Sequence, residues 1–318
     1  MFLDWLWLIV GMALLIKGAD FFVDGASKIA KALRIPSLII GLTLVSMGTS
    51  APEASVSINA AINDMNDLSI GNVVGSNMFN TLFILGVSAF FIPLVVSKEM
   101  EKYDIPIMVG VYLVLILFGF VITPYTLNLI ESIFLLLLFA GYIGFLIYRA
   151  KKSPNENVEE DEEENPRSKK TIFKSIIIAA LGLTAIIFGG DLVVDSASNI
   201  AINLGMSEAL VGLTIVAVGT SLPELVTSVV ASIKKEADIA VGNVIGSNIF
   251  NVIFILGLSS SISPLAVNAA VFIDVVVMLA SGIIIMVFTL FSNKINKWQG
   301  AMLALLYVAY LTYIIIRN

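Results

Sequence analysis

Long apolar segments recur along the whole chain and constrain its fold more than any other feature. A bilayer core of about 30 Å requires a helix of about 20 predominantly apolar residues. Ten segments of this kind lie near residues 3–23, 36–62, 68–95, 105–123, 127–149, 172–194, 207–233, 239–265, 269–291 and 298–316. Apolar residues form 58% of the chain, more than a soluble domain could keep from water. The sequence therefore predicts an all-α membrane protein with ten transmembrane helices.

Lysine and arginine gather on one side of this predicted arrangement. When the ten segments cross the membrane alternately, every basic residue except Lys17 and Arg317 falls on the same side. The positive-inside rule places that side in the cytoplasm. The first segment carries Asp4 where a secretory signal would carry positive charge, so we expect a membrane helix there. We thus expect a multi-pass protein of the cell (plasma) membrane with both termini outside.

Two sequence blocks return 171 positions later in the chain. GTSAPE at 48–53 returns as GTSLPE at 219–224, and GNVVGSNMFN at 71–80 returns as GNVIGSNIFN at 242–251. Each half holds five predicted helices, and an odd number makes the second half enter the membrane from the opposite face. This is the inverted-repeat architecture of secondary transporters. The predicted units are a five-helix repeat at 1–150, a linker at 151–170 and an inverted five-helix repeat at 171–318.

The predicted linker is strongly acidic. Seven acidic residues stand between basic flanks in residues 151–170. Such a composition is typical of a solvated, disordered segment, which the predicted topology places in the cytoplasm. A regulatory calcium-binding segment is the alternative, although a flexible acidic run lacks fixed ligand geometry.

Each repeated GTS-x-PE block places a glutamate inside an apolar segment. Glu53 and Glu224 are costly there, roughly 2.5–3.5 kcal/mol at a helix centre, and intramembrane acids usually mark an ion path. Pro52 lacks an amide donor, so we expect a broken helix with freed carbonyls near Thr49. Thr49, Ser50 and Glu53 can share one helix face. The second copy offers Thr220, Ser221, Pro223 and Glu224.

The second block forms a polar stripe on an apolar helix. Asn72, Ser76 and Asn80 recur every four residues, and Asn77 lies near the edge of the stripe. The second copy supplies Asn243, Ser247, Asn248 and Asn251. Such residues also bridge membrane helices without binding ions. For Asn72 and Asn243 packing or capping stays as plausible as ion binding, and we expect Asp20, Asp24, Asp191 and Asp195 at helix ends as interfacial or capping groups.

The chain contains no histidine and no cysteine, so any ion site must be built from oxygen. Two facing carboxylates neutralise one divalent cation. With the carbonyls of Thr49 and Thr220 and water, they reach the six to eight oxygens that Ca²⁺ prefers. Mg²⁺ demands stricter geometry, and softer metals prefer sulfur or imidazole. Na⁺ accepts the same oxygens, so one site that binds either ion in turn, with alternating access, predicts an antiporter.

At these four blocks the chain resembles the alpha-repeats of the cation/calcium antiporter superfamily, most closely its prokaryotic sodium/calcium exchangers. The resemblance implies a calcium site formed by Glu53, Glu224 and the carbonyls of Thr49 and Thr220. It implies flanking sodium sites at Ser50, Ser76, Thr220, Ser221 and Ser247, with the carbonyls of Ser46 and Ala217, and a central layer completed by Asn80 and Asn251. The first and sixth helices would slide over the core. Potassium-dependent members carry aspartate at the position of Asn251, which argues against potassium co-transport.

Three other functions remain to be weighed. A Ca²⁺/H⁺ antiporter of the same superfamily could use the two glutamates alone, and a calcium-selective channel is less favoured because the helices are broken. No enzyme is expected: Phe188–Asp191 reads FGGD and misses the GxGD motif of intramembrane aspartyl proteases, and no phosphate loop is present. We expect Ca²⁺ and Na⁺ as substrates, the lipid bilayer as surroundings, no cofactor, no nucleic acid, and a monomer.

Overall fold

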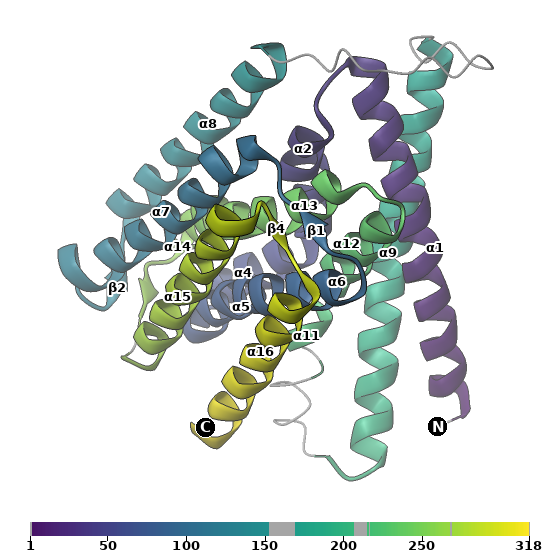
Figure 1. Ribbon diagram of the computed structural model, residues 1–318. Helices are drawn as coiled ribbons and strands as arrows, with labels where there is room; N and C mark the ends of the chain where they lie inside the picture. Colours follow the sequence, from purple (N-terminus) through teal and green to yellow (C-terminus); the bar gives the residue numbers. More distant parts are fainter. Residues whose placement is uncertain (1, 153–168, 207–214, 216, 268, 318) are drawn as a thin grey trace.

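The computed structural model describes the chain except residues 1, 153–168, 207–214, 216, 268 and 318. The described part is almost entirely helical (Figure 1). The predicted acidic linker falls largely within 153–168, outside the described residues, and so does the start of the predicted seventh segment.

The elements follow in chain order, with η marking a π-helical turn. They are α1 (Phe2–Leu33), α2 (Ser37–Ile40), η1 (Gly41–Val45), α3 (Ser46–Thr49), α4 (Ala51–Ile62), α5 (Asn66–Met78), η2 (Phe79–Ile84), α6 (Leu85–Phe91), β1 (Leu94–Val95), η3 (Met100–Asp104), α7 (Ile105–Ile116), η4 (Leu117–Ile122), β2 (Thr126–Leu127), α8 (Leu129–Lys152), α9 (Lys169–Asn203), α11 (Ala217–Gly219), α12 (Leu222–Ile233), α13 (Ala237–Phe250), η6 (Asn251–Leu256), α14 (Gly257–Ile262), β3 (Leu265–Ala266), α15 (Ala269–Ser292), β4 (Lys294–Ile295) and α16 (Lys297–Arg317).

Eight helices in the described residues are long and apolar enough to cross a membrane. They are Phe2–Leu33, Asn66–Phe91, Met100–Ile122, Leu129–Lys152, Lys170–Asn203, Ala237–Ile262, Val271–Ser292 and Lys297–Arg317. Ser37–Thr49 and Leu222–Ile233 are shorter apolar helices. The repeated GTS-x-PE blocks at 48–53 and 219–224 span the helix breaks at one end of each, which is why these two helices are short. The protein is thus an all-helical, multi-pass membrane protein.

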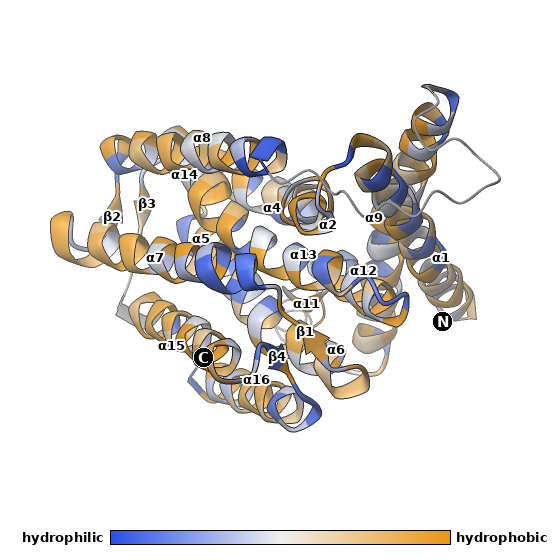
Figure 2. Cartoon of the chain, turned by 45° about the horizontal axis from the view of Figure 1, so that its top comes forward, coloured by the Kyte–Doolittle hydropathy of each residue, from blue (hydrophilic) through white to orange (hydrophobic). Residues whose placement is uncertain are grey.

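Two helical rods form the centre of the molecule. In Asn66–Phe91 78% of the apolar window is buried and in Ala237–Ile262 94%, against 44% or less in the six other long helices. Figure 2 shows hydrophobic residues along most of the outer helices α8 and α15, as expected for helices that face lipid. The two rods that carry the GN-xx-GSN blocks therefore lie inside a shell of lipid-facing helices.

Helices α1 and α9 lie side by side at one edge of the molecule (Figure 1). A Cβ added at Gly182 of α9 would lie 2.5 Å from the backbone nitrogen of Phe22 and 2.7 Å from the backbone oxygen of Gly18. The two backbones can approach this closely because neither glycine has a side chain, as at other small-residue contacts between membrane helices. The pair therefore packs as one tight unit.

The predicted helix-end position of four aspartates is wrong. Helix α1 runs from Phe2 to Leu33 and α9 from Lys169 to Asn203, well beyond the apolar windows that predicted their ends. Asp20, Asp24, Asp191 and Asp195 consequently lie inside these helices. The physical reason is that helix formation does not end where the apolar window ends: α1 meets no proline before Pro36.

Two short antiparallel strand pairs join loops that are distant in sequence. Strand β1 pairs with β4, with Leu94 opposite Ile295, and β2 pairs with β3, with Leu127 opposite Leu265. Each pair therefore joins a loop of the first half of the chain to one of the second half.

Candidate functional site

The second predicted segment is broken at Ser50, as the sequence predicts. Helix α3 ends at Thr49 and α4 begins at Ala51, while Ser50 adopts φ −80° and ψ 8°, outside the helical range. Pro52 has no amide hydrogen to donate to the carbonyl of Gly48. In the second half, α11 ends at Gly219 and α12 begins at Leu222. The residues at both breaks are those that the sequence nominated as ligands.

The glutamates that follow the two breaks are each held by a serine from the other half. The Ser50 hydroxyl donates to Glu224 Oε1 at 2.9 Å, and the Ser221 hydroxyl donates to Glu53 Oε1 at 2.7 Å. All four side chains have 0% exposure. The two breaks therefore face one another, and two formally negative groups lie together in a site closed to solvent.

The serines of the central rods reach the same place. The Ser76 hydroxyl lies beside the Glu53 carboxyl group without the geometry of a hydrogen bond. The Ser247 hydroxyl interacts with the Glu224 carboxyl group and donates to the backbone oxygen of Ser46 at 3.3 Å. The structure thus brings Ser76 and Ser247 to the carboxylates, and Ser46 to Ser247.

Asn80 and Asn251 lie at the start of the two π-helical turns in the central rods. Asn80 Nδ2 donates to Asn248 Oδ1 at 3.2 Å, and Asn251 Nδ2 donates to Asn77 Oδ1 at 3.0 Å. Both bonds cross from one half of the chain to the other. A π-helical turn interrupts the helical hydrogen-bond ladder and occurs frequently at functional sites.

Several buried oxygens of the nominated residues have no hydrogen-bond partner among the described residues. They are Glu53 Oε2, Glu224 Oε2, Ser76 Oγ, Thr220 Oγ1, Asn80 Oδ1 and Asn251 Oδ1. A buried polar group without a partner costs about 1–3 kcal/mol, so such groups call for an explanation. Oxygen atoms of this kind are the ligands that hard cations prefer.

Asn72 and Asn243 form the hydrogen bonds expected of a structural brace. Asn72 Nδ2 donates to the backbone oxygen of Glu53 at 3.1 Å and to Ser57 Oγ at 2.8 Å. Asn243 Nδ2 donates to the backbone oxygen of Glu224 at 3.4 Å and to Ser228 Oγ at 3.0 Å. Each asparagine thus ties the glutamate's helix to the neighbouring rod, the packing role that the sequence left open.

Thr49 belongs to the same network, and Ala217 is described only by its backbone. The Thr49 hydroxyl lies 3.0 Å from Asn243 Oδ1 and 3.1 Å from the backbone oxygen of Val45. Ala217 begins α11, one turn before the second break.

Asp274, another acidic residue of the second half, is not part of this network. It pairs with Arg317 through two hydrogen bonds of 2.9 and 3.0 Å.

Sequence reasoning missed Ser57 and Ser228, and it noted Asn77 and Asn248 without giving them a role in the site. Asn77 and Asn248 hold the amides of Asn251 and Asn80, and Ser57 and Ser228 complete the braces. All four recur at the same 171-residue spacing as the nominated ligands. That spacing, applied to every polar residue of these segments, could have found Ser57 and Ser228.

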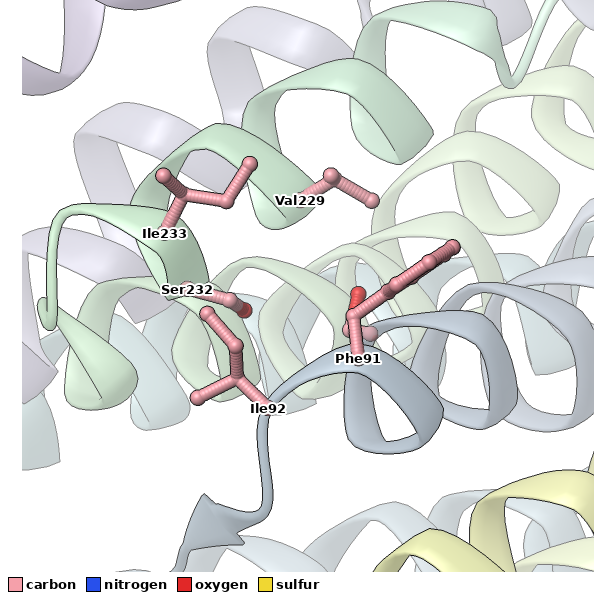
Figure 3. A pocket seen from close by; sticks show the side chains of 6 residues that line it. Phe91, Ile92, Val229, Ser232 and Ile233 are labelled. Atoms are coloured by element: carbon pink, nitrogen blue, oxygen red, sulfur yellow. The ribbon is translucent and has the colours of Figure 1, made fainter.

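A cavity of about 250 Å³ lies between the ends of α6 and α12 (Figure 3). It is lined by Ser88, Phe91, Ile92, Val229, Ser232 and Ile233, and its exposed walls are almost wholly apolar. The cavity shares no residue with the carboxylate site, and its surface offers almost no oxygen to a cation.

In the described part of the chain, no cluster of three or more His, Cys, Asp or Glu residues occurs. The carboxylate site has two acids, and its other oxygens are neutral. Such a site offers at most two formal charges to a cation.

The comparison with known proteins agrees with the motifs. The model of the sodium/calcium exchanger protein family matches residues 3–148 and 174–316. The chain therefore belongs to the sodium/calcium exchanger family, and the resemblance noted in the sequence is confirmed.

Relatives and solved structures resemble the chain over nearly its full length. The sodium/calcium exchanger MaX1 of Methanosarcina acetivorans is 35% identical over 97% of each chain. A provisionally named antiporter, CaxA, of Alkalimonas amylolytica is 37% identical over 96% of each chain. The sodium-calcium exchanger NCX_Mj, soaked with Na⁺ and Ca²⁺, superposes with a TM-score of 0.83 at 30% identity and 98% coverage of both chains. The family and the fold are thus those of cation exchangers.

Proposed function

We propose that the protein is a secondary antiporter that exchanges Na⁺ for Ca²⁺ by alternating access to one closed site near the middle of the membrane. The observation that carries this proposal is the crossed pairing of Ser50 with Glu224 and of Ser221 with Glu53, in which Oε2 of each buried glutamate has no hydrogen-bond partner among the described residues. The two glutamates belong to different halves of the chain, so one cation could bridge the halves.

Ca²⁺ fits the charge and the ligand types of this site. Glu53 and Glu224 together neutralise one divalent cation, and the carbonyls of Thr49 and Thr220 would add two neutral oxygens. Ca²⁺ accepts six to eight oxygens at about 2.3–2.6 Å in flexible geometry. With Asn80 and Asn251 as neutral neighbours, the site needs no third acid.

Na⁺ is the proposed coupling ion because hydroxyl and amide oxygens flank the carboxylates. Ser50, Ser76, Ser221 and Ser247 would contribute hydroxyls, and Ser46 and Ala217 would contribute backbone carbonyls. Asn251 carries no charge, which favours an exchanger without potassium. The name of MaX1 states sodium/calcium exchange for that relative.

Proton coupling is the second candidate. Glu53 and Glu224 are fully buried, and each accepts a hydrogen bond from a serine. Either carboxylate could bind a proton when the cation has left the site. The name of CaxA specifies no ion and leaves both possibilities open. A channel is less favoured, since these side chains are closed to solvent.

The proposed architecture is ten transmembrane helices in two inverted five-helix repeats, 1–150 and 171–318, joined by the linker 151–170. Its support is that structural details recur 171 residues apart: positive φ occurs at Arg34 and Gly205 and at Asp64 and Lys235. We place the protein in the plasma membrane, where the basic residues favour an orientation with the linker in the cytoplasm and both termini outside.

Carboxamide substitution tests the site. Glu53→Gln and Glu224→Gln keep the shape of each side chain but remove one of two negative charges, so we expect each to lower ⁴⁵Ca²⁺ uptake at least about a hundredfold, a loss of about 3 kcal/mol in cation binding. Uptake is measured in proteoliposomes loaded with Na⁺, and size-exclusion elution with thermal melting reports the fold. The half-buried Glu101→Gln, which lies outside the site, is the control. Full exchange in both site variants would overturn the assignment.

A further inference from the structure

Four asparagines form two crossed pairs in the middle of the molecule. Asn251 Nδ2 donates to Asn77 Oδ1 at 3.0 Å, and Asn80 Nδ2 donates to Asn248 Oδ1 at 3.2 Å. All four side chains have 0% exposure. In each pair one member belongs to the proposed ion ligands, and the other is an asparagine that touches that ligand across the interface between the halves.

The pairing decides which end of each ligand amide is free. An asparagine amide has an oxygen that accepts hydrogen bonds and a nitrogen that donates two. The nitrogens of Asn80 and Asn251 are used by the paired asparagines, whereas the oxygens of both have no partner among the described residues. A rotation of either amide by 180° would exchange an oxygen for a donor group that repels cations.

Asn77 and Asn248 are themselves held in one orientation. Asn77 Nδ2 donates to the backbone oxygen of Asn248 at 3.1 Å, and Asn248 Nδ2 donates to Thr81 Oγ1 at 2.7 Å. Rotation of the Asn77 amide would break its bond to that backbone oxygen and bring its NH₂ group against that of Asn251. The backbone oxygen of Asn248 and Thr81 Oγ1 therefore fix the amides of Asn77 and Asn248. These amides in turn fix the direction of the unpartnered amide oxygens of Asn251 and Asn80.

We propose that Asn77 and Asn248 are positioning residues: they hold Asn251 and Asn80 with the amide oxygen toward the transported cation. The proposal rests on the proposed function, because it takes Asn80 and Asn251 as cation ligands. Asn77 and Asn248 act through their partners and donate no ligand of their own. Each works on the ligand of the opposite half, Asn77 on Asn251 and Asn248 on Asn80.

The mechanism is tested by comparing the effect of Asn77→Leu in the wild-type protein with its effect in the Asn251→Asp variant. Asn77→Leu removes the acceptor for Asn251, so we expect the half-saturating Ca²⁺ concentration of uptake to rise about tenfold while the maximal rate stays within about twofold. In an Asn251→Asp background both ends of the side chain are oxygen, and the orientation no longer matters. There Asn77→Leu should change the half-saturating concentration by less than about twofold.

The crossed combination is the matched control. Asn80 is held by Asn248, so Asn77→Leu should keep its full tenfold effect in an Asn80→Asp background. The mirror set, Asn248→Leu with Asn80→Asp, should show the same rescue and provides a second variant where Asn77→Leu does not fold. An undiminished effect in the Asn251→Asp background, or equal rescue by both aspartates, would show that Asn77 only packs and would overturn the proposal.

Direct binding separates this proposal from the proposed function. ⁴⁵Ca²⁺ binding to the detergent-solubilised protein is measured beside uptake. If Asn251→Asp does not suppress the effect of Asn77→Leu while Glu53→Gln still abolishes binding, the positioning role alone is overturned. Wild-type protein that neither binds nor transports Ca²⁺ would instead overturn the proposed function, and the positioning role with it.

Discussion

Individual side chains explain how two acidic groups persist in the interior of the protein. The carboxylates of Glu53 and Glu224 each accept a hydrogen bond from a serine of the opposite half, at 2.7 and 2.9 Å. A hydrogen bond to a charged group contributes about 1.5–3 kcal/mol, and it also fixes the direction of the free oxygen Oε2. The serine thus stabilises and orients the acid at the same time.

Removal of either serine hydroxyl should affect exchange equally. Ser50→Ala frees the Glu224 carboxylate and Ser221→Ala frees that of Glu53, so we expect each to raise the half-saturating Ca²⁺ concentration about tenfold. The measurement is ⁴⁵Ca²⁺ uptake over a range of Ca²⁺ concentrations, with the exposed Ser55→Ala on the same helix α4 as control. A large effect of one substitution beside no effect of the other would contradict the crossed arrangement.

At this scale the sequence predicted residue types better than partners. The duplicated blocks nominated the serines that bond to the two glutamates, but not Ser57 and Ser228 in the braces beside them. They did not predict that Ser50 pairs with Glu224 rather than with Glu53 on its own helix, because that choice depends on how the two halves face each other. The sequence placed Asn77 and Asn248 at the edge of the polar stripe because it assumed an ideal helix of 3.6 residues per turn. The π-helical turns that directly follow depart from that geometry.

At the scale of elements, α1 is tied to the turn between α12 and α13. Lys234 Nζ lies 2.6 Å from Asp20 Oδ1 and 2.6 Å from Asp24 Oδ1, and Ser27 Oγ donates to Glu236 Oε1 at 2.6 Å. The position 171 residues before Lys234 is Asn63, which is uncharged. The first half therefore lacks the lysine needed to form this tether in mirror image.

The tether should contribute modestly to stability. Exposed ion pairs are worth about 0–1 kcal/mol, so we expect Lys234→Met to lower the melting temperature in detergent by about 2 °C. Adding Asp24→Asn should lower it little further, since both changes break the same contact. The neighbouring exposed Lys235→Met is the control. Fully additive losses would show that Lys234 and Asp24 act independently.

The tether should also be insensitive to pH over a wide range. Burial lowers the pKa of Lys234, but hydrogen bonds to Asp20 and Asp24 outweigh it and raise the pKa above the usual lysine value. A raised lysine pKa means that the stabilisation is fully present below the unfolded-state pKa and is lost as pH rises through the folded-state pKa. The difference between wild type and Lys234→Met should thus stay constant from pH 7 to 9.

The extent of α1 shows what an apolar window leaves undetermined. The window near 3–23 indicates which residues can cross a bilayer, whereas the helix continues to Leu33 because helical propensity and the pairing with α9 do not stop at its edge. The break at Ser50 was predictable because Pro52 and Gly48 act locally. Local signals thus set the break, and tertiary packing sets the helix length.

For the whole molecule, the duplication carries the functional argument. It predicts that equivalent residues of the two halves meet, and the structure brings them together: Asn77 of the first half contacts Asn248, its copy 171 residues later. Composition and apolar periodicity predicted a helical membrane protein, and the repeat predicted where its polar centre lies. Neither determines the coupling ion, because Na⁺ and a proton can both be held by these oxygens.

The most direct test of the account is therefore the driving ion. Proteoliposomes loaded with Na⁺ are diluted into Na⁺-free buffer with ⁴⁵Ca²⁺ and compared with vesicles that contain K⁺ or carry an imposed pH gradient. The account predicts Ca²⁺ uptake that requires the outward Na⁺ gradient and does not respond to the pH gradient. Uptake driven by the pH gradient and indifferent to Na⁺ would contradict it and establish proton coupling instead.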